Sequence, residues 1–293
     1  MFIGAITKEI PLPQDQSVLL NVFGSLLLVV SGVTYLRLVR RVGREGGRVR
    51  SDLFGAPDVL VAVTLAAFLA MLLLLQWIAP AAAHAHGGGA APSKEVTGLQ
   101  VIYGSLQFAL PVLAILAILI GRNISLPEVF GFRRVGIVRA FALGVALLLL
   151  LVPLFLLVTS IAYQFLDRHA EQQELVKIYQ NAAKAGKRDL AWEIAFAAVC
   201  IAPITEEILF RGYFYPVFKR LFGALPAALG TSVLFAAIHN NAIGFPGLAL
   251  LALALTLAYE RTGSILVPIL MHASFNGANL LFMWWAVKNG WMQ

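Results

Sequence analysis

The sequence has few charged residues and only one cysteine. Asp, Glu, Lys and Arg make up 13% of its 293 residues, whereas about a quarter of the residues in soluble domains are charged. This scarcity excludes an ordinary soluble domain, and the single cysteine, Cys200, excludes an intrachain disulfide. The first 16 residues lack the basic region and cleavage site of a signal peptide, so we expect the first apolar segment to be retained as a helix.

The sequence is instead rich in long runs of apolar residues. Hydrophobic residues make up 60% of the chain and the mean hydropathy is +0.83. The runs recur at about 20 residues, the length that crosses the hydrocarbon core of a bilayer. We therefore predict an all-α, polytopic membrane protein with about eight transmembrane helices. The predicted helices cover residues 17–36, 58–79, 99–121, 138–163, 191–219, 225–242, 246–259 and 264–287.

Basic residues cluster at the ends of these runs. The net charge is +7, but this placement favours topology signals and contact with the lipid bilayer over nucleic-acid binding. The first connector, RLVRRVGREGGRVR, contains six arginines between Arg37 and Arg50. Placing this connector in the cytoplasm leaves both termini outside. We expect an integral protein of a prokaryotic inner or plasma membrane.

Two connectors on the predicted outer side differ in composition. The small-residue segment 81–94 contains His84 and His86. Two histidines in a glycine-rich loop do not make a metal site, and we interpret this segment as a solvated linker. The polar segment 165–189 is predicted to hold an amphipathic helix on the membrane surface, because of the spacing of its apolar residues, Leu175, Ile178, Tyr179 and Ala182.

Three ionisable residues interrupt the fifth predicted helix in the stretch EEILFRG. Glu207 and Arg211 are four residues apart, so they share a helical face and can form an ion pair. Glu206 points about 100° away and has no partner in its own helix. A charge at the centre of a span costs roughly 2.5–3.5 kcal/mol, which favours a function for Glu206 over a structural role. Pro203 removes one helical hydrogen bond, and we expect the carbonyl of Val199 to be left free.

Two further polar pairs lie in later helices. FAAIH places Phe235 and His239 four residues apart, and HASFN does the same for His272 and Asn276. A single histidine in a span is commonly an interhelical hydrogen-bonding residue. At about 1.5 Å per residue, however, Glu206, the two histidines and Asn276 lie at similar depths in their helices. This convergence predicts a catalytic site.

The three motifs, in this order, resemble those of the CPBP family of intramembrane proteases, which includes the type II CAAX prenyl endopeptidases. The family signatures EExxxR, FxxxH and HxxxN are intact here, and the resemblance covers about residues 138–287. It implies a protease core at 138–293, preceded by a three-helix membrane region at 1–137 without an assigned role. It also implies hydrolysis of a peptide bond near the C-terminus of a membrane-associated protein or peptide.

The resemblance further implies a role for each motif residue. Glu206 corresponds to the general base, which activates water together with His239. His272 and Asn276 correspond to the pair that stabilises the oxyanion. Side chains of these types suit these tasks chemically. The supporting residues that hold the site together are Glu207, Arg211 and Phe235.

The sequence leaves three questions open. Relatives have been described as metal-dependent, and Glu206, His239 and His272 could bind a divalent ion such as zinc. HExxH is missing, so we prefer glutamate-activated water without a cofactor.

A proton- or ion-coupled transporter would use the same residues, but no inverted repeat is evident. A catalytically idle immunity or scaffold protein is the third reading. The substrate could be a prenylated tail, a peptide precursor or a sorting anchor.

Overall fold

The computed structural model describes residues 14–85, 98–166 and 174–290, with side chains at 21–75, 109–166 and 178–290. These residues form helices joined by turns and loops, and no strand occurs among them. In chain order the helices are α2 (Gln14–Glu45), α3 (Ala56–Ala85), α4 (Gly98–Gly121), α5 (Leu126–Val129), α6 (Ile137–Phe165), α7 (Glu174–Lys184), α8 (Arg188–Phe196), η1 (Ala197–Ile201), α9 (Ala202–Glu207), η2 (Ile208–Phe214), α10 (Tyr215–Phe222), α11 (Ala224–Ile238), α12 (Phe245–Thr262) and α13 (Leu266–Lys288).

The prediction of an all-α membrane protein is confirmed. Each predicted span overlaps one helix or, for residues 191–219, the continuous helical run from α8 to α10. Two ends were predicted wrongly, because α2 continues past 36 to Glu45, into the predicted connector, and α11 ends at Ile238, before 242. Four helices are long and apolar enough to cross a membrane, namely Asn21–Glu45, Ala56–Leu75, Ile137–Phe165 and Leu266–Lys288. Two shorter helices, Ala109–Gly121 and Ala224–Ile238, are also apolar. The count of eight transmembrane helices stays a prediction.

The histidine-containing connector begins later than predicted. Helix α3 continues to Ala85, so residues 81–85 are helical and His84 belongs to the helix. A run of alanines favours helix over loop, which explains the difference. His86 and the rest of the predicted linker lie outside the described residues.

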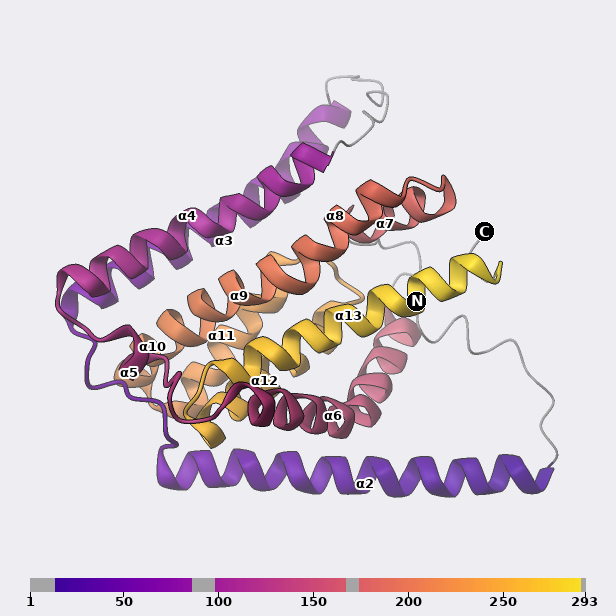
Figure 1. Ribbon diagram of the computed structural model, residues 1–293, viewed down its shortest axis with the longest axis horizontal. Coiled ribbons are helices and arrows are strands. Elements are labelled where there is room, and N and C mark those ends of the chain that lie inside the picture. Colours follow the sequence, from indigo (N-terminus) through magenta and orange to yellow (C-terminus); the bar gives the residue numbers. More distant parts are fainter. Residues whose placement is uncertain (1–13, 86–97, 167–173, 291–293) are drawn as a thin grey trace.

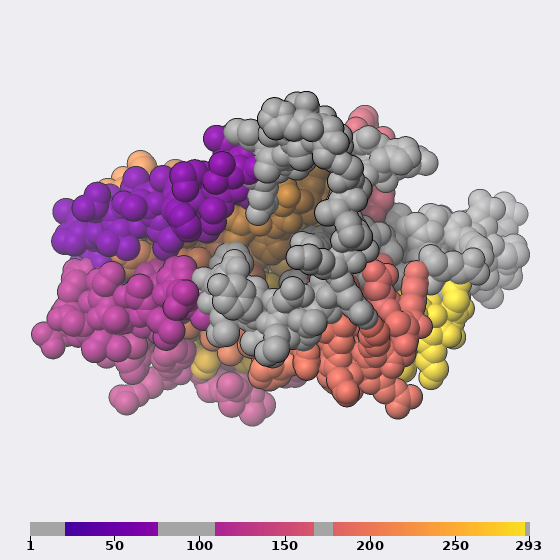
Figure 2. All heavy atoms as spheres, turned by 90° about the horizontal axis from the view of Figure 1, so that it is seen from above, coloured from indigo at the N-terminus to yellow at the C-terminus, as the bar shows by residue number. Residues whose placement is uncertain are grey.

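Helix α12 lies at the centre of the packing. It contacts α6, α11, α13 and α2, and most of its residues from Leu251 to Glu260 are buried. Figure 1 shows α2 along one edge of the molecule and the pair α3 and α4 on the opposite side of this central group. From above, α3 (violet) and α4 (magenta) lie beside each other at one end (Figure 2). Helix α4 contacts the run from α8 to η2, so the N-terminal helices pack directly on the part of the chain that carries the motifs.

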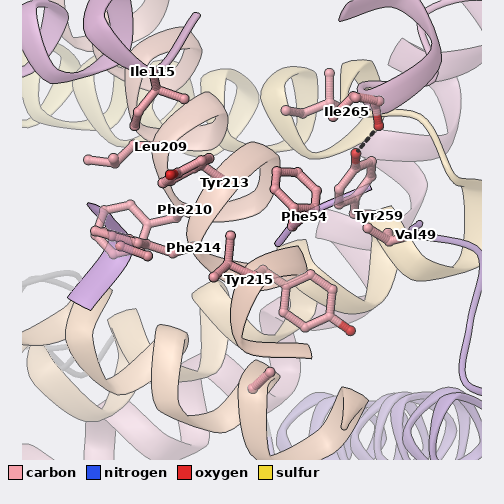
Figure 3. Close-up of a cluster of buried hydrophobic side chains, with 14 of the residues drawn as sticks. Val49, Phe54, Ile115, Leu209, Phe210, Tyr213, Phe214, Tyr215, Tyr259 and Ile265 are labelled. Carbon is pink, nitrogen blue, oxygen red and sulfur yellow. Dashed lines mark hydrogen bonds between the residues drawn. The ribbon is translucent and has the colours of Figure 1, made fainter. Parts of the chain in front are cut away.

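A cluster of buried aromatic rings fixes the η2 segment. Phe210, Tyr213 and Phe214 are fully buried and are joined there by Phe54 from the α2–α3 connector (Figure 3). The rings of Phe54 and Tyr213 meet edge to face, with centroids 5.9 Å apart, a favoured geometry for aromatic pairs. The cluster thereby holds the helix that follows Glu207 at a defined rotation.

The buried carboxylate of Glu260 links the arginine-rich connector to the core through hydrogen bonds. Glu260 Oε1 accepts hydrogen bonds from Tyr215 Oη and Lys219 Nζ, both at 2.5 Å. Its Oε2 accepts from the backbone N–H of Val49 at 2.9 Å. Gly47 has φ +71°, and a Cβ there would lie 1.9 Å from Glu260 Oε2, so glycine is required at this position. The sequence analysis did not single out Glu260, which lies just beyond the predicted span 246–259.

The predicted amphipathic helix exists as α7, but its apolar face packs on the protein. Tyr179 and Ala182 are both buried, and Tyr179 belongs to a cluster that includes Ile194 and Leu280. The expectation that this face lies on the membrane surface is therefore wrong for these two residues. Amphipathic spacing identifies a buried face without saying whether lipid or protein covers it.

Candidate active site

The two adjacent glutamates lie in a short α-helical segment, α9, between two π-helical segments. The backbone N–H of Ala202 donates to the carbonyl of Ala197, five residues back. The same register at the next residue would pair Pro203, which has no N–H, with the carbonyl of Ala198 instead of the predicted Val199. The side-chain Nδ2 of Asn276 donates to that Ala198 oxygen at 2.7 Å. A residue of α13 thus supplies the hydrogen bond that proline removes.

Glu207 and Arg211 form the ion pair that their spacing predicts. Arg211 Nη1 lies 2.8 Å from Glu207 Oε1, and both side chains are buried. The guanidinium also donates to the carbonyl of Ala252 at 2.8 Å and to Thr256 Oγ1 at 3.4 Å. Helix α12 is therefore a fourth component of the site, which the sequence analysis missed. The sequence does contain an indication of this contact, since Thr256 is the one polar side chain between Phe245 and Ala258.

Both motif histidines are held through Nδ1. His239 Nδ1 lies 2.7 Å from the carbonyl oxygen of Phe235, which can only accept a hydrogen bond. His272 Nδ1 lies 2.9 Å from Glu207 Oε1, the oxygen that also accepts from Arg211. Nδ1 is therefore the donor in both rings, and each neutral imidazole presents an unprotonated Nε2.

These two Nε2 atoms approach the same oxygen of Glu206. Glu206 Oε2 lies 4.0 Å from His239 Nε2 and 3.9 Å from His272 Nε2. Glu206 Oε2 is buried and has no hydrogen-bond partner. The side chains of Glu206 and His239 keep 12% and 19% of their exposure, so a path to the site remains. Three hydrogen-bond acceptors from three helices thus surround one small space.

Phe235 packs against both halves of the site. Its ring is fully buried, and the Arg211 guanidinium lies 4.8 Å from its centroid, within cation–π range. The centroids of the His239 and His272 rings lie 4.7 and 5.7 Å from it. Phe235 therefore holds the two imidazoles in position, both by ring contact and, for His239, through its backbone carbonyl.

A water molecule fits the separation of these acceptors. Two atoms 3.9 Å apart can each accept a hydrogen bond of about 2.8 Å from one water. A carboxylate and two imidazoles also match zinc chemically, but ligands at about 2.1 Å in a tetrahedron lie only about 3.4 Å apart. Among the described residues, no group of three or more His, Cys, Asp or Glu side chains has the geometry of a metal site.

One side of the broken helix is exposed and apolar. Phe196, Cys200 and Ile204 succeed each other at four-residue intervals along η1 and its flanking segments. All three side chains are exposed. This face points away from the acceptor cluster, and its composition suits contact with acyl chains.

The comparisons with known proteins agree with the geometry. A family model described as "Type II CAAX prenyl endopeptidase Rce1-like" matches residues 188–278, the stretch that contains all three motifs. The match supports the assignment of this region to the CPBP/CAAX protease family. The matched region begins at α8, so the predicted boundary between 1–137 and 138–293 lies outside the match and stays a prediction.

Two further comparisons, with curated proteins and with solved structures, give little information about function. An Escherichia coli protein named "Uncharacterized 24.3 kDa protein" is 37% identical over 87 residues, which are 28% of this chain. The chain spans 40% of that relative's length. No solved structure matches.

Proposed function

We propose that this protein is an intramembrane endopeptidase that cleaves near the C-terminus of a membrane-associated protein or peptide. The matched family model supports the reaction class, since its description is that of a type II CAAX prenyl endopeptidase, Rce1-like. The observation that carries the mechanism is the approach of His239 Nε2 and His272 Nε2 to the unpartnered Glu206 Oε2. A carboxylate oxygen without a hydrogen-bond partner, beside two imidazole acceptors, suits the binding and deprotonation of water.

In the proposed reaction, Glu206 is the general base. A water held by Glu206 Oε2 and one imidazole Nε2 gives its proton to Glu206 while its oxygen attacks the carbonyl carbon of the substrate. The tetrahedral intermediate then collapses, the C–N bond breaks, and Glu206 returns the proton to the leaving nitrogen. His239 orients the water, because its Nδ1 is fixed by the Phe235 carbonyl and its Nε2 is free to accept.

The oxyanion role of His272 and Asn276 belongs to the same proposal. It requires a proton on His272 Nε2 in addition to the one on Nδ1, which donates to Glu207. It also requires the second N–H of Asn276, because the first is used by Ala198. If the enzyme uses a divalent ion, Glu206, His239 and His272 would hold it, and the ion would polarise the water as a Lewis acid.

C-terminal proteomics tests the function directly. Membranes from cells that express the wild type should contain trimmed C-termini that are absent with Glu206→Gln. Purified protein in liposomes should cleave a peptide derived from such a substrate. If neither difference appears and the liposomes instead show proton or ion flux that depends on Glu206, the protein is a transporter and the proposal is wrong.

A further inference from the structure

Four arginines share one face at the end of α2. Arg37, Arg40, Arg41 and Arg44 follow the i, i+3, i+4, i+7 spacing of a helical stripe. All four are exposed. Together with Glu45 they line a surface cavity of about 440 Å³. A shallow, open surface depression lined by four guanidinium groups has the charge to attract an anion.

The protein itself neutralises little of this charge. Glu45 is the acidic residue of the cavity, and it pairs with Arg41 at 2.8 Å. Within the described residues, Arg37, Arg40 and Arg44 form no ion pair with a carboxylate. Three positive charges on one face are therefore available to an external ligand.

The surroundings of the arginines indicate which anion this is. The preceding turns of α2 expose apolar side chains, among them Val29, Val30, Val33 and Leu36, in a helix apolar and long enough to cross a membrane. Apolar surface followed directly by positive charge matches the order of acyl chain and phosphate in a phospholipid. A second cavity of about 580 Å³, which shares Arg44 and Glu45 with the first, provides room for the rest of a headgroup.

The choice of arginine adds to this argument. Lysine would serve equally well as a topology signal, yet the connector from Arg37 to Arg50 contains no lysine, although lysines occur elsewhere in the chain. The planar guanidinium donates two parallel hydrogen bonds to phosphate oxygens, which an ammonium group does not. We propose that the end of α2 binds the phosphate headgroup of an anionic phospholipid, with the acyl chains along the exposed apolar face.

Native mass spectrometry of the full-length protein in detergent tests this site. The test variant is Arg37→Gln/Arg40→Gln/Arg44→Gln. The matched control is Arg133→Gln/Arg139→Gln/Arg261→Gln, which removes three other exposed arginines. Each variant lowers the net charge from +7 to +4 (7 − 3 = 4). The titrants are phosphatidylglycerol, phosphatidylcholine and inorganic phosphate, and equal thermal unfolding midpoints without lipid show that both variants are folded.

The wild type and the control should bind phosphatidylglycerol with the same Kd, and the test variant about fivefold more weakly for each arginine removed. Phosphatidylcholine should bind weakly to all three. Equal losses in the test and control variants would overturn the site in favour of diffuse charge. Equal binding of phosphatidylglycerol and phosphatidylcholine would also overturn the proposed site. If inorganic phosphate displaces phosphatidylglycerol at comparable concentrations, the ligand is free phosphate and the lipid assignment is wrong.

Discussion

Glu207 Oε1 accepts hydrogen bonds from His272 Nδ1, at 2.9 Å, and from Arg211 Nη1, at 2.8 Å. One carboxylate oxygen thus joins the imidazole of α13 to the guanidinium of η2. The adjacent Glu206 has a buried oxygen without any partner. Glu207 Oε2 is likewise buried without a hydrogen-bond partner, but Glu207 is ion-paired with Arg211 through Oε1, whereas Glu206 forms no ion pair with an arginine or lysine among the described residues. Their substitutions should therefore have different consequences.

We expect Glu206→Gln to abolish cleavage and to leave thermal stability unchanged or raised, because it removes the proposed base and a largely buried charge that is not ion-paired with an arginine or lysine. Glu207→Gln should lower both stability and activity. It leaves the Arg211 guanidinium without its ion pair, and breaking a buried pair costs about 3–5 kcal/mol. Thermal unfolding in detergent and a peptide-cleavage assay on both variants measure these effects.

Two results would contradict this assignment of roles. The first is near-normal turnover by Glu206→Gln. The second is a Glu207→Gln protein that is inactive but fully stable. Glu45→Gln serves as a control for the loss of one carboxylate, because Glu45 is exposed and pairs only with its neighbour in the same helix, Arg41.

Asn276→Ala should destabilise the protein by about 1 kcal/mol, because the partly buried carbonyl of Ala198 loses its donor. In a Pro203→Ala background the restored backbone N–H can serve that carbonyl instead. The same Asn276→Ala substitution should then shift the unfolding midpoint less. A double-mutant cycle of these two changes, followed by thermal unfolding, measures the difference.

The same cycle separates the two roles of Asn276. If the side chain only clamps the broken helix, Pro203→Ala should restore both stability and cleavage to the Asn276→Ala protein. If it also stabilises the oxyanion, stability returns but kcat stays low with little change in KM, and we expect this second outcome. An unfolding shift of equal size in both backgrounds would refute the clamp.

Metal removal tests the preference for glutamate-activated water. We expect purified protein to carry substoichiometric zinc and to keep its activity after thorough chelation. Elemental analysis and the cleavage assay measure both quantities. Near-stoichiometric metal in the wild type but not in Glu206→Gln, together with chelator-sensitive activity that zinc restores, would show that Glu206, His239 and His272 bind an ion.

Cysteine labelling tests the predicted orientation, which rests on the arginine-rich connector. A cysteine introduced at Arg44 should react with a membrane-impermeant maleimide only after the inner face is made accessible. A cysteine in the segment 81–94 should react from outside in intact cells. The reverse pattern would overturn the assignment of both termini to the outside.

Local spacing predicted much of this molecule. The i, i+4 rule identified the Glu207–Arg211 pair, and apolar run lengths located the helices. Hydrophobic periodicity did not predict the π-helical segments, because a wider turn has no signature in it. Local residue spacing also does not predict contacts between helices that are distant in sequence. The Arg211–Ala252 hydrogen bond and the anchoring of Val49 by Glu260 depend on tertiary packing.

The lone cysteine has a practical consequence for such labelling experiments. Cys200 is exposed on the protein, but its helical neighbours Phe196 and Ile204 are exposed and apolar as well. In a bilayer, acyl chains rather than water would surround that thiol, and water-soluble maleimides do not partition into such surroundings. We therefore expect Cys200 to remain unlabelled by water-soluble maleimides in intact membranes. All the labelling then comes from the cysteine introduced elsewhere. In detergent solution, a bilayer-permeant spin label could instead be attached to Cys200 as a reporter on the helix that carries Glu206.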